Sequence, residues 1–260
     1  MSLVLAVLAG LLGLAVGSFL NVVIHRVPRG ESVVRPGSHC PRCGEAIRGR
    51  HNVPVVGWLV LRGRCADCRL PISARYPLVE LATGLLFAAV TVRLDTSPGA
   101  VPAFLWFASI GVALALIDLD VRRLPNAIVL PSYPVLLVLL GGAAAWQHDW
   151  WSFGRAVIGG AALFAFYFVL VLAYPAGMGW GDVKLAGLVG GVLAYLSWGA
   201  LLVGAFAGFL LGAVVGVAMM AAGRGGRKTA LPFGPFMIAG VLLAVFAAAP
   251  LASWYGPLLR

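Results

Sequence analysis

The chain has 260 residues, of which 61% are hydrophobic and 11% charged, and its formal net charge is +10. Soluble domains are about 45–50% apolar and about 25% charged, so this composition excludes an ordinary soluble protein and indicates a polytopic membrane protein in a lipid bilayer. Ten of the nineteen Lys and Arg residues fall in one polar segment, residues 24–76. Most others lie in short loops, a distribution typical of topology signals rather than of nucleic-acid binding, and we expect no nucleic-acid partner.

The apolar runs predict an all-α membrane helix bundle. The first run, residues 2–23, is followed by basic residues rather than preceded by them, so we interpret it as an uncleaved anchor and not as a secretory signal. Further runs lie at about 77–93, 100–117, 126–146, 155–174, 183–197, 200–222 and 230–249. Because a spanning helix needs about 20 residues, the run 183–197 is short. We expect eight spans, or seven if that run is re-entrant.

The basic residues predict the orientation of these spans. With eight spans, sixteen Lys and Arg residues fall on the face that carries residues 24–76, and only Arg93, Arg155 and Arg260 fall on the other. The positive-inside rule then places residues 24–76 in the cytoplasm and both termini outside. The same topology brings Asp118, Asp120 and Asp182 to the cytoplasmic side.

All four cysteines lie in the polar segment, as the pairs Cys40/Cys43 and Cys65/Cys68. Two CxxC motifs separated by 21 residues are typical of a tetrahedral thiolate site for one structural Zn²⁺ ion. The alternatives are disulfides, a redox role or a fold without metal. Disulfides are rare in the cytoplasm. A segment with few aliphatic residues cannot form a sufficient hydrophobic core and needs a metal ion or a cross-link to stabilise it, so we interpret the four cysteines as a zinc site.

Two acidic sites occur at junctions between apolar runs and polar segments. Asp182 ends the stretch Gly177-Met178-Gly179-Trp180-Gly181-Asp182, and Asp118 and Asp120 follow the run that ends at Ile117. A carboxylate at membrane depth costs about 2.5–3.5 kcal/mol, so it indicates function. Two acids near one membrane face are what an aspartyl protease needs. The alternative for Asp182 is an N-cap of the following helix.

Six motifs in order resemble the type IV prepilin peptidases, also called leader peptidases, which are GxGD-type intramembrane aspartyl peptidases of type IV pilus and type II secretion systems. The motifs are Gly17-Ser18-Phe19-Leu20-Asn21-Val22, the paired CxxC motifs, the segment 71–81 that ends in Glu80-Leu81, Asp118 with Leu124-Pro125-Asn126, Gly179-Trp180-Gly181-Asp182, and Pro232-Phe233-Gly234-Pro235.

The resemblance implies a membrane aspartyl endopeptidase whose catalytic acids are Asp118 and Asp182. It implies removal of the short basic leader of prepilins or pseudopilins at the cytoplasmic face of the bacterial inner membrane. Many members of the family also methylate the new N-terminus with S-adenosylmethionine, although we find no methyltransferase motif in the sequence. The family often has Asp where this chain has Asn126.

The resemblance also divides the chain into three parts: a first transmembrane helix (1–23), a zinc domain (24–76) and a peptidase domain (77–260). Within the peptidase domain, residues two apart on a helix point about 200° apart, so Asp118 and Asp120 cannot both face Asp182. We interpret Asp120 as a polar residue at a helix end.

Several further residues are candidates for substrate binding or support of the acids. They are Gly179, Gly181, Lys184, Glu80, Pro232, Phe233, Gly234 and Pro235. For Lys184 the simpler interpretation is positive-inside charge, and for the four residues 232–235 it is a helix-start loop. Glu80 either pairs with Arg75 or binds substrate. The paired glycines at 159–160 and 190–191, and those at 204, 208 and 212, indicate close helix packing.

Two other functions compete with the peptidase. In an ion- or proton-coupled transporter, buried acids carry cations, but this role explains neither the cysteine pairs nor the ordered motifs. In a non-catalytic secretion scaffold, the cysteine segment would hold partners and the acids would have no part. Asparagine at Asp118 or Asp182 separates the peptidase from the scaffold.

Overall fold

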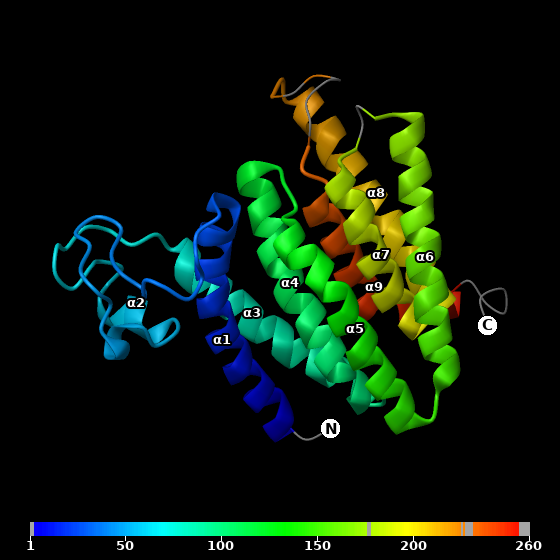
Figure 1. Ribbon diagram of the computed structural model, residues 1–260, viewed down its shortest axis with the longest axis horizontal. Helices are drawn as coiled ribbons and strands as arrows, with labels where there is room; N and C mark the ends of the chain where they lie inside the picture. Colours follow the sequence, from blue (N-terminus) through cyan, green and yellow to red (C-terminus); the bar gives the residue numbers. More distant parts are fainter. Residues whose placement is uncertain (1–2, 176–177, 225, 227–230, 255–260) are drawn as a thin grey trace. The chain divides into compact units, whose positions relative to one another are not determined.

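The computed structural model describes residues 3–175, 178–224, 226 and 231–254, and these residues are helical apart from loops, turns and two isolated β-bridges (Figure 1). Of the predicted stretch around the second acid, Gly177 lies outside the described residues. The helices are α1 (Leu3–Arg26), α2 (Val56–Val60), α3 (Arg75–Arg93), α4 (Val101–Val121), α5 (Asn126–Gln147), α6 (Trp150–Ala173), α7 (Trp180–Leu196), α8 (Trp198–Ala221) and α9 (Gly234–Trp254).

The predicted all-α membrane fold is confirmed, because each of the eight apolar runs coincides with one helix. Among the described residues, six helices are long and apolar enough to cross a membrane: α1, α3, α4, α5, α6 and α8. The other two are shorter: helix α7 has 17 residues, and the apolar part of α9 is the short segment Gly234–Ala247. The run at 183–197 is therefore a short helix that begins three residues earlier than the sequence predicts.

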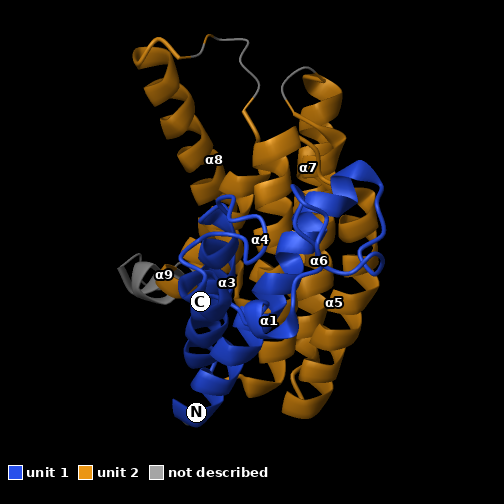
Figure 2. Cartoon of the chain, turned by 90° about the vertical axis from the view of Figure 1, so that its left-hand side faces the viewer, with its two compact units in different colours: residues 1–96 blue, residues 97–260 orange. Residues whose placement is uncertain are grey.

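The chain divides into two compact units, residues 1–96 and residues 97–260 (Figure 2). In the first unit, α1 packs along α3 through glycines. A Cβ atom on Gly13 would lie 2.8 Å from Gly84 Cα, and one on Gly17 would lie 2.7 Å from Glu80 Cα. Such distances are too short for any side chain, so glycine at these positions allows the two backbones to touch. This contact explains the glycine of the Gly17-Ser18 motif.

In the second unit, α7 is the central helix. It contacts each of the other five long helices of the unit: α4, α5, α6, α8 and α9. Twelve of its seventeen residues are buried, which no other helix of the unit approaches among the described residues. A helix this enclosed is held by its neighbours on all sides. The buried residues concentrate from Leu185 to Tyr195, so this packing holds the body of the helix, and Asp182 lies in the less enclosed first turn.

Glycines produce the close helix contacts in this unit, as predicted for the glycine pairs. A Cβ atom on Gly190 of α7 would lie 2.4 Å from the carbonyl oxygen of Gly159 in α6. Helices α8 and α9 touch in the same way, because a Cβ atom on Gly240 would lie 2.4 Å from the carbonyl oxygen of Gly204.

Arg155 closes the far end of α7. Arg155, the first residue of the predicted run 155–174, lies in the second turn of α6, where its guanidinium donates to the carbonyl oxygens of Ala194, Tyr195 and Leu196. These are carbonyls of the last turn of α7, which have no partner within the helix. The positive charge also opposes the negative end of the helix dipole. Arg155 is thus a C-terminal cap supplied by a neighbouring helix.

Candidate active site and cysteine cluster

Asp118 lies in the last turn of α4, with 5% of its surface exposed. The helix continues to Val121, so Asp118 is inside the helix rather than after it. Its Oδ2 atom accepts a hydrogen bond from the backbone N–H of Gly234, at 3.0 Å. Gly234 begins α9 and belongs to the Pro-Phe-Gly-Pro motif. This motif therefore supplies a fixed donor to the first acid, which its sequence alone does not reveal.

Asp182 lies in the first turn of α7, with 8% of its surface exposed. The N-cap is Gly179, so Asp182 is not itself the N-cap, but as the third helical residue it caps the start of α7 in a capping box. Its Oδ2 atom accepts from the backbone N–H of Gly179, at 3.1 Å. Each of the two acids thus accepts one backbone N–H, from a glycine, through the same carboxylate oxygen.

Leu124 connects the surroundings of the two acids. It lies in the loop between α4 and α5, and its side chain fills the space that glycine leaves at two positions. A Cβ atom on Gly181 would lie 2.9 Å from Leu124 Cβ, and one on Gly234 would lie 3.2 Å from Leu124 Cδ2. Gly181 directly precedes Asp182, and Gly234 donates to Asp118, so Leu124 contacts a neighbour of each acid. The structure therefore brings together the motifs that contain Asp118, Leu124, Gly181 and Gly234.

The other candidate residues of this unit have different surroundings. Asp120 is exposed, as expected for a residue that points away from Asp118. Lys184 Nζ donates to Asn126 Oδ1 at 3.0 Å, so these two motif residues contact each other.

Phe233 packs in an aromatic cluster with Tyr167 of α6 and Phe209 of α8, with ring centroids 5.1 to 6.2 Å apart. Tyr167 and Phe209 could not be predicted from the sequence, because nothing in their apolar helices distinguishes them from lipid-facing aromatic residues.

In the first unit, the four cysteines form one cluster. Their Sγ atoms all lie within 4.8 Å of one another, and the Sγ atoms of Cys40 and Cys68 are 3.9 Å apart. Four thiolates around Zn²⁺ at about 2.3 Å would be about 3.8 Å apart, so the cluster has the size of a zinc site. None of the four forms a disulfide.

Each cysteine pair is presented by the same backbone turn. The N–H of Cys40 donates to Glu45 O and that of Gly44 to Cys40 O, both at 2.9 Å. Cys65 repeats the pattern, because its N–H donates to Leu70 O and its carbonyl accepts from Arg69. The N–H groups of Cys43 and Arg42 lower the pKa of the Cys40 thiol to about 6, which favours the thiolate that a metal binds.

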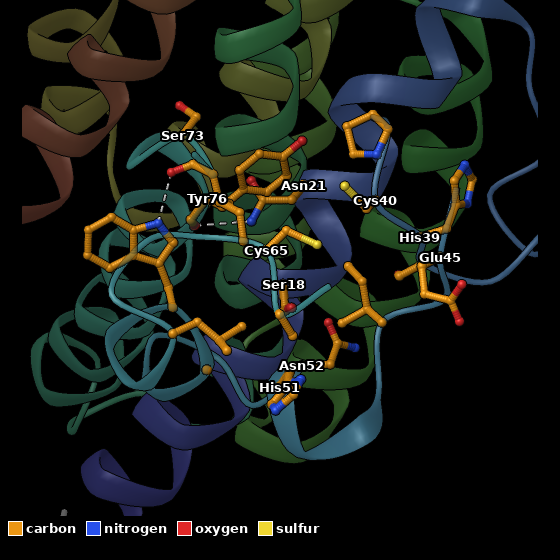
Figure 3. Close-up of a pocket in the computed structure, with 18 of the residues that line it drawn as sticks. Ser18, Asn21, His39, Cys40, Glu45, His51, Asn52, Cys65, Ser73 and Tyr76 are labelled. Carbon is orange, nitrogen blue, oxygen red and sulfur yellow. Dashed lines mark hydrogen bonds between the residues drawn. The ribbon is translucent and has the colours of Figure 1, made fainter. Parts of the chain in front are cut away.

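Glu80 is buried near this cluster, with 8% of its surface exposed. Its Oε2 atom accepts from the N–H of Val55 at 2.7 Å and so fixes the loop that precedes α2. Glu80 also lines a cavity of ≈ 470 Å³ between the end of α1, the cysteine segment and the start of α3. Figure 3 shows Ser18 and Asn21 of α1 at this cavity, together with Cys40 and Cys65.

The fold and these sites define a helical membrane protein with two buried aspartates in one unit and a four-cysteine cluster in the other. Residues 11–94 match the bacterial peptidase A24 N-terminal domain, and residues 105–217 match the type IV leader peptidase family. The chain belongs to the type IV leader peptidase family.

Three similar proteins are each named prepilin leader peptidase/N-methyltransferase. The relative from Myxococcus xanthus is 43% identical over 86% of this chain and 66% of its own length. The one from Aeromonas hydrophila is 36% identical over 94% of this chain and 91% of its own length. The one from Burkholderia pseudomallei is 36% identical over 92% and 84%. No solved structure matches this chain significantly. These relatives favour neither the transporter nor the scaffold.

Proposed function

We propose that the chain is a membrane aspartyl endopeptidase that removes the basic leader from prepilins or pseudopilins, with Asp118 and Asp182 as its catalytic acids. The observation that carries this proposal is the matched environment of the two carboxylates. Both are buried, both accept one glycine N–H through Oδ2, and Leu124 joins their surroundings. The names of the relatives support the choice of substrate.

The chemistry follows from the closeness of two carboxylates. Like charges cannot both ionise cheaply, so the pair shares one proton. The ionised acid removes a proton from water while the protonated acid polarises the scissile carbonyl. The N–H groups of Gly179 and Gly234 orient the two carboxylates before substrate binds, because each N–H holds one oxygen of its acid. The proton belongs to the pair rather than to one acid.

Three single substitutions test this assignment. Asp118→Asn and Asp182→Asn keep the shape of the side chain but remove the shared proton, so each should abolish leader cleavage. Asp120→Asn is the matched control two residues away on the same helix, and it should keep cleavage because Asp120 is exposed. The assay is mass spectrometry of a prepilin incubated with purified protein. Cleavage by both Asp118→Asn and Asp182→Asn would refute the aspartyl mechanism.

We infer that the acids and the cysteine segment face the cytoplasm of the bacterial inner membrane. The support is the excess of Lys and Arg on that face. An engineered cysteine at Ser97 should react with an impermeant maleimide added outside intact cells, and one at Arg224 should not, with the unsubstituted protein as background. Reaction of both from the same side would contradict the eight-span topology.

We infer a second activity, methylation of the new N-terminus, and place its methyl donor in the cavity of the first unit. The donor implied by the relatives' names is S-adenosylmethionine, which carries a cationic sulfonium and an ammonium group. Four of the nine acidic residues line the cavity together with three arginines, of which Arg48 pairs with Asp67, and the cavity volume suits a ligand of this size. The four are Glu31, Glu45, Asp67 and Glu80.

When bound, S-adenosylmethionine supplies an electrophilic methyl group, and the buried carboxylate of Glu80 would hold one of its positive charges. Glu80→Gln keeps an acceptor for the Val55 N–H but removes the charge, so it should weaken binding of S-adenosylmethionine in calorimetry and leave leader cleavage intact. Unchanged binding in Glu80→Gln would exclude Glu80 from the donor site.

We also propose that the four cysteines hold one structural Zn²⁺ ion. The Sγ spacing fits tetrahedral thiolate coordination, and four protein ligands leave no open position for catalysis. The two backbone turns that carry the cysteines pre-form the site.

A further inference from the structure

Two hydrogen bonds join helices α5 and α7, and both of them involve Lys184. The hydroxyl of Tyr133 in α5 donates to the carbonyl oxygen of Lys184 at 2.6 Å. The ammonium of Lys184 donates to Asn126 Oδ1, at the start of α5, at 3.0 Å. The two bonds are independent, because one uses the backbone of Lys184 and the other its side chain. Both join α5 to α7 two residues after Asp182.

The space for Tyr133 is made by a glycine. A Cβ atom on Gly187 would lie 2.1 Å from the Tyr133 hydroxyl oxygen and 3.0 Å from its Cζ atom. Any other residue at position 187 would therefore push the phenol away from α7. Two prolines, Pro131 and Pro134, flank Tyr133 inside α5 and restrict the backbone on either side of it.

These contacts lie on the part of α7 that carries Asp182. Leu124, just before α5, packs against Gly181. The segment Leu124 to Tyr133 thus holds the first two turns of α7 at three points: Gly181 by contact, Lys184 by its ammonium and Lys184 again by its carbonyl. Because a helix is stiff, a shift of α5 against α7 moves the Asp182 carboxylate by a similar amount.

We propose that Tyr133 is a positioning residue for Asp182: its hydrogen bond to the Lys184 carbonyl fixes the first turns of α7 so that Asp182 meets Asp118 at the distance the shared proton requires. The hydrogen bond between Lys184 and Asn126 acts in the same way, and the two bonds together are called the α5–α7 latch. The proposal rests on the proposed role of Asp182 as a catalytic acid.

Tyr133→Phe in the full-length protein tests it, because it removes only the hydroxyl. A misplacement of about 1 Å can cost about 100-fold in rate, so a smaller shift should lower kcat for leader cleavage by about tenfold. KM for the prepilin should stay within about twofold, since Tyr133 does not touch substrate. The range of pH over which cleavage occurs should narrow, because acids that lie farther apart split their apparent pKa values less.

Tyr195→Phe is the matched control. It removes a buried hydroxyl from α7 itself, at the opposite end from Asp182, and that hydroxyl has no hydrogen-bond partner within the described part of the chain. Its kcat and pH range should equal those of the wild type. The pH range does not depend on how much enzyme is folded, so it separates positioning from a loss of stability.

Two further variants test the second bond of the α5–α7 latch. Lys184→Met removes the ammonium and keeps the carbonyl, so it should lower kcat less than Tyr133→Phe, by about threefold on the same scale. Asn126→Asp replaces the amide by a carboxylate that pairs with the ammonium, and it should keep the wild-type kcat.

Wild-type kcat and pH range in Tyr133→Phe would overturn the proposal, and so would a raised KM with an unchanged pH range. Failure of the proposed function is a different result, since it would appear as cleavage by Asp182→Asn.

Discussion

Gly181→Ala is the substitution whose effect can be worked out most directly from the structure. The added Cβ atom would lie 2.9 Å from Leu124 Cβ, 3.4 Å from its Cγ and 3.3 Å from its Cδ1. Ordinary carbon–carbon contacts are about 3.5–4.0 Å, so Leu124 or the first turn of α7 must move by about 0.6–1 Å. Asp182 is the next residue in that turn, and it moves with it.

We expect this shift to lower kcat for leader cleavage about 10- to 100-fold, because a misplacement of about 1 Å can cost about 100-fold. Overpacking of this kind also destabilises proteins by about 1–3 kcal/mol. Cleavage is measured by mass spectrometry of the prepilin product, and stability by thermal unfolding in detergent. Gly142→Ala in α5 is the control, since a Cβ atom there would meet nothing within 4 Å.

A double-mutant cycle with Leu124→Gly identifies the cause. Leu124→Gly removes the Cβ, Cγ and Cδ1 atoms that the new methyl group meets, so the double variant should cleave faster than Gly181→Ala alone. The two substitutions would then be coupled by more than about 0.5 kcal/mol, as expected for residues in contact. If their effects on ΔG‡ simply add, the contact between Leu124 and Gly181 does not control the acid, and the reasoning is refuted.

Three other predictions concern the supports of the fold. Elemental analysis should find one Zn²⁺ per chain. Cys43→Ser should lose the ion and reduce the stability of the first unit while leaving leader cleavage measurable. A fully active preparation without zinc would contradict this prediction. Arg155→Met should lower the free energy of unfolding by about 2–3 kcal/mol, because three carbonyls of α7 lose a charged donor; an unchanged melting temperature would show that Arg155 is not a cap. Asp149 is the N-cap of α6, so Asp149→Ala should lower the free energy of unfolding by about 1 kcal/mol. Hydrogen bonds from Ser152 lower the pKa of Asp149 in the folded protein. The difference in unfolding free energy between wild type and Asp149→Ala should therefore be complete above about pH 4 and shrink as the pH falls through that lowered pKa.

The sequence predicted the helices well because apolar runs in a membrane protein directly report the segments that cross it. Each of the eight runs became one helix, and the two CxxC pairs became one cluster. Both signals are local: a run or a spacing is visible without knowing what it packs against. The motif order likewise identified Asp118 and Asp182, but only by resemblance to the family.

The contacts that hold the acids could not be predicted, because they join residues far apart in sequence. Gly234 donates to Asp118 across 116 positions, and Tyr133 donates to Lys184 across 51. Arg155 shows the same limit, since the sequence reveals its charge at the start of an apolar run but not that its guanidinium caps α7. In each case the partner is a backbone N–H or carbonyl, which every residue carries and no sequence pattern marks.

The shortness of α7 has a consequence for how water reaches the acids. Seventeen residues span about 25 Å, less than the roughly 30 Å of hydrocarbon in a bilayer. The longer helices α5, α6 and α8 contact α7. The difference between the length of α7 and the thickness of the hydrocarbon is therefore covered by protein rather than by lipid. The ends of α7 are therefore polar, with Asp182 at one and the Arg155 guanidinium at the other. In the proposed function, hydrolysis consumes one water molecule per leader removed, and a short central helix places Asp182 at a helix end, where a path for that water need cross less hydrocarbon.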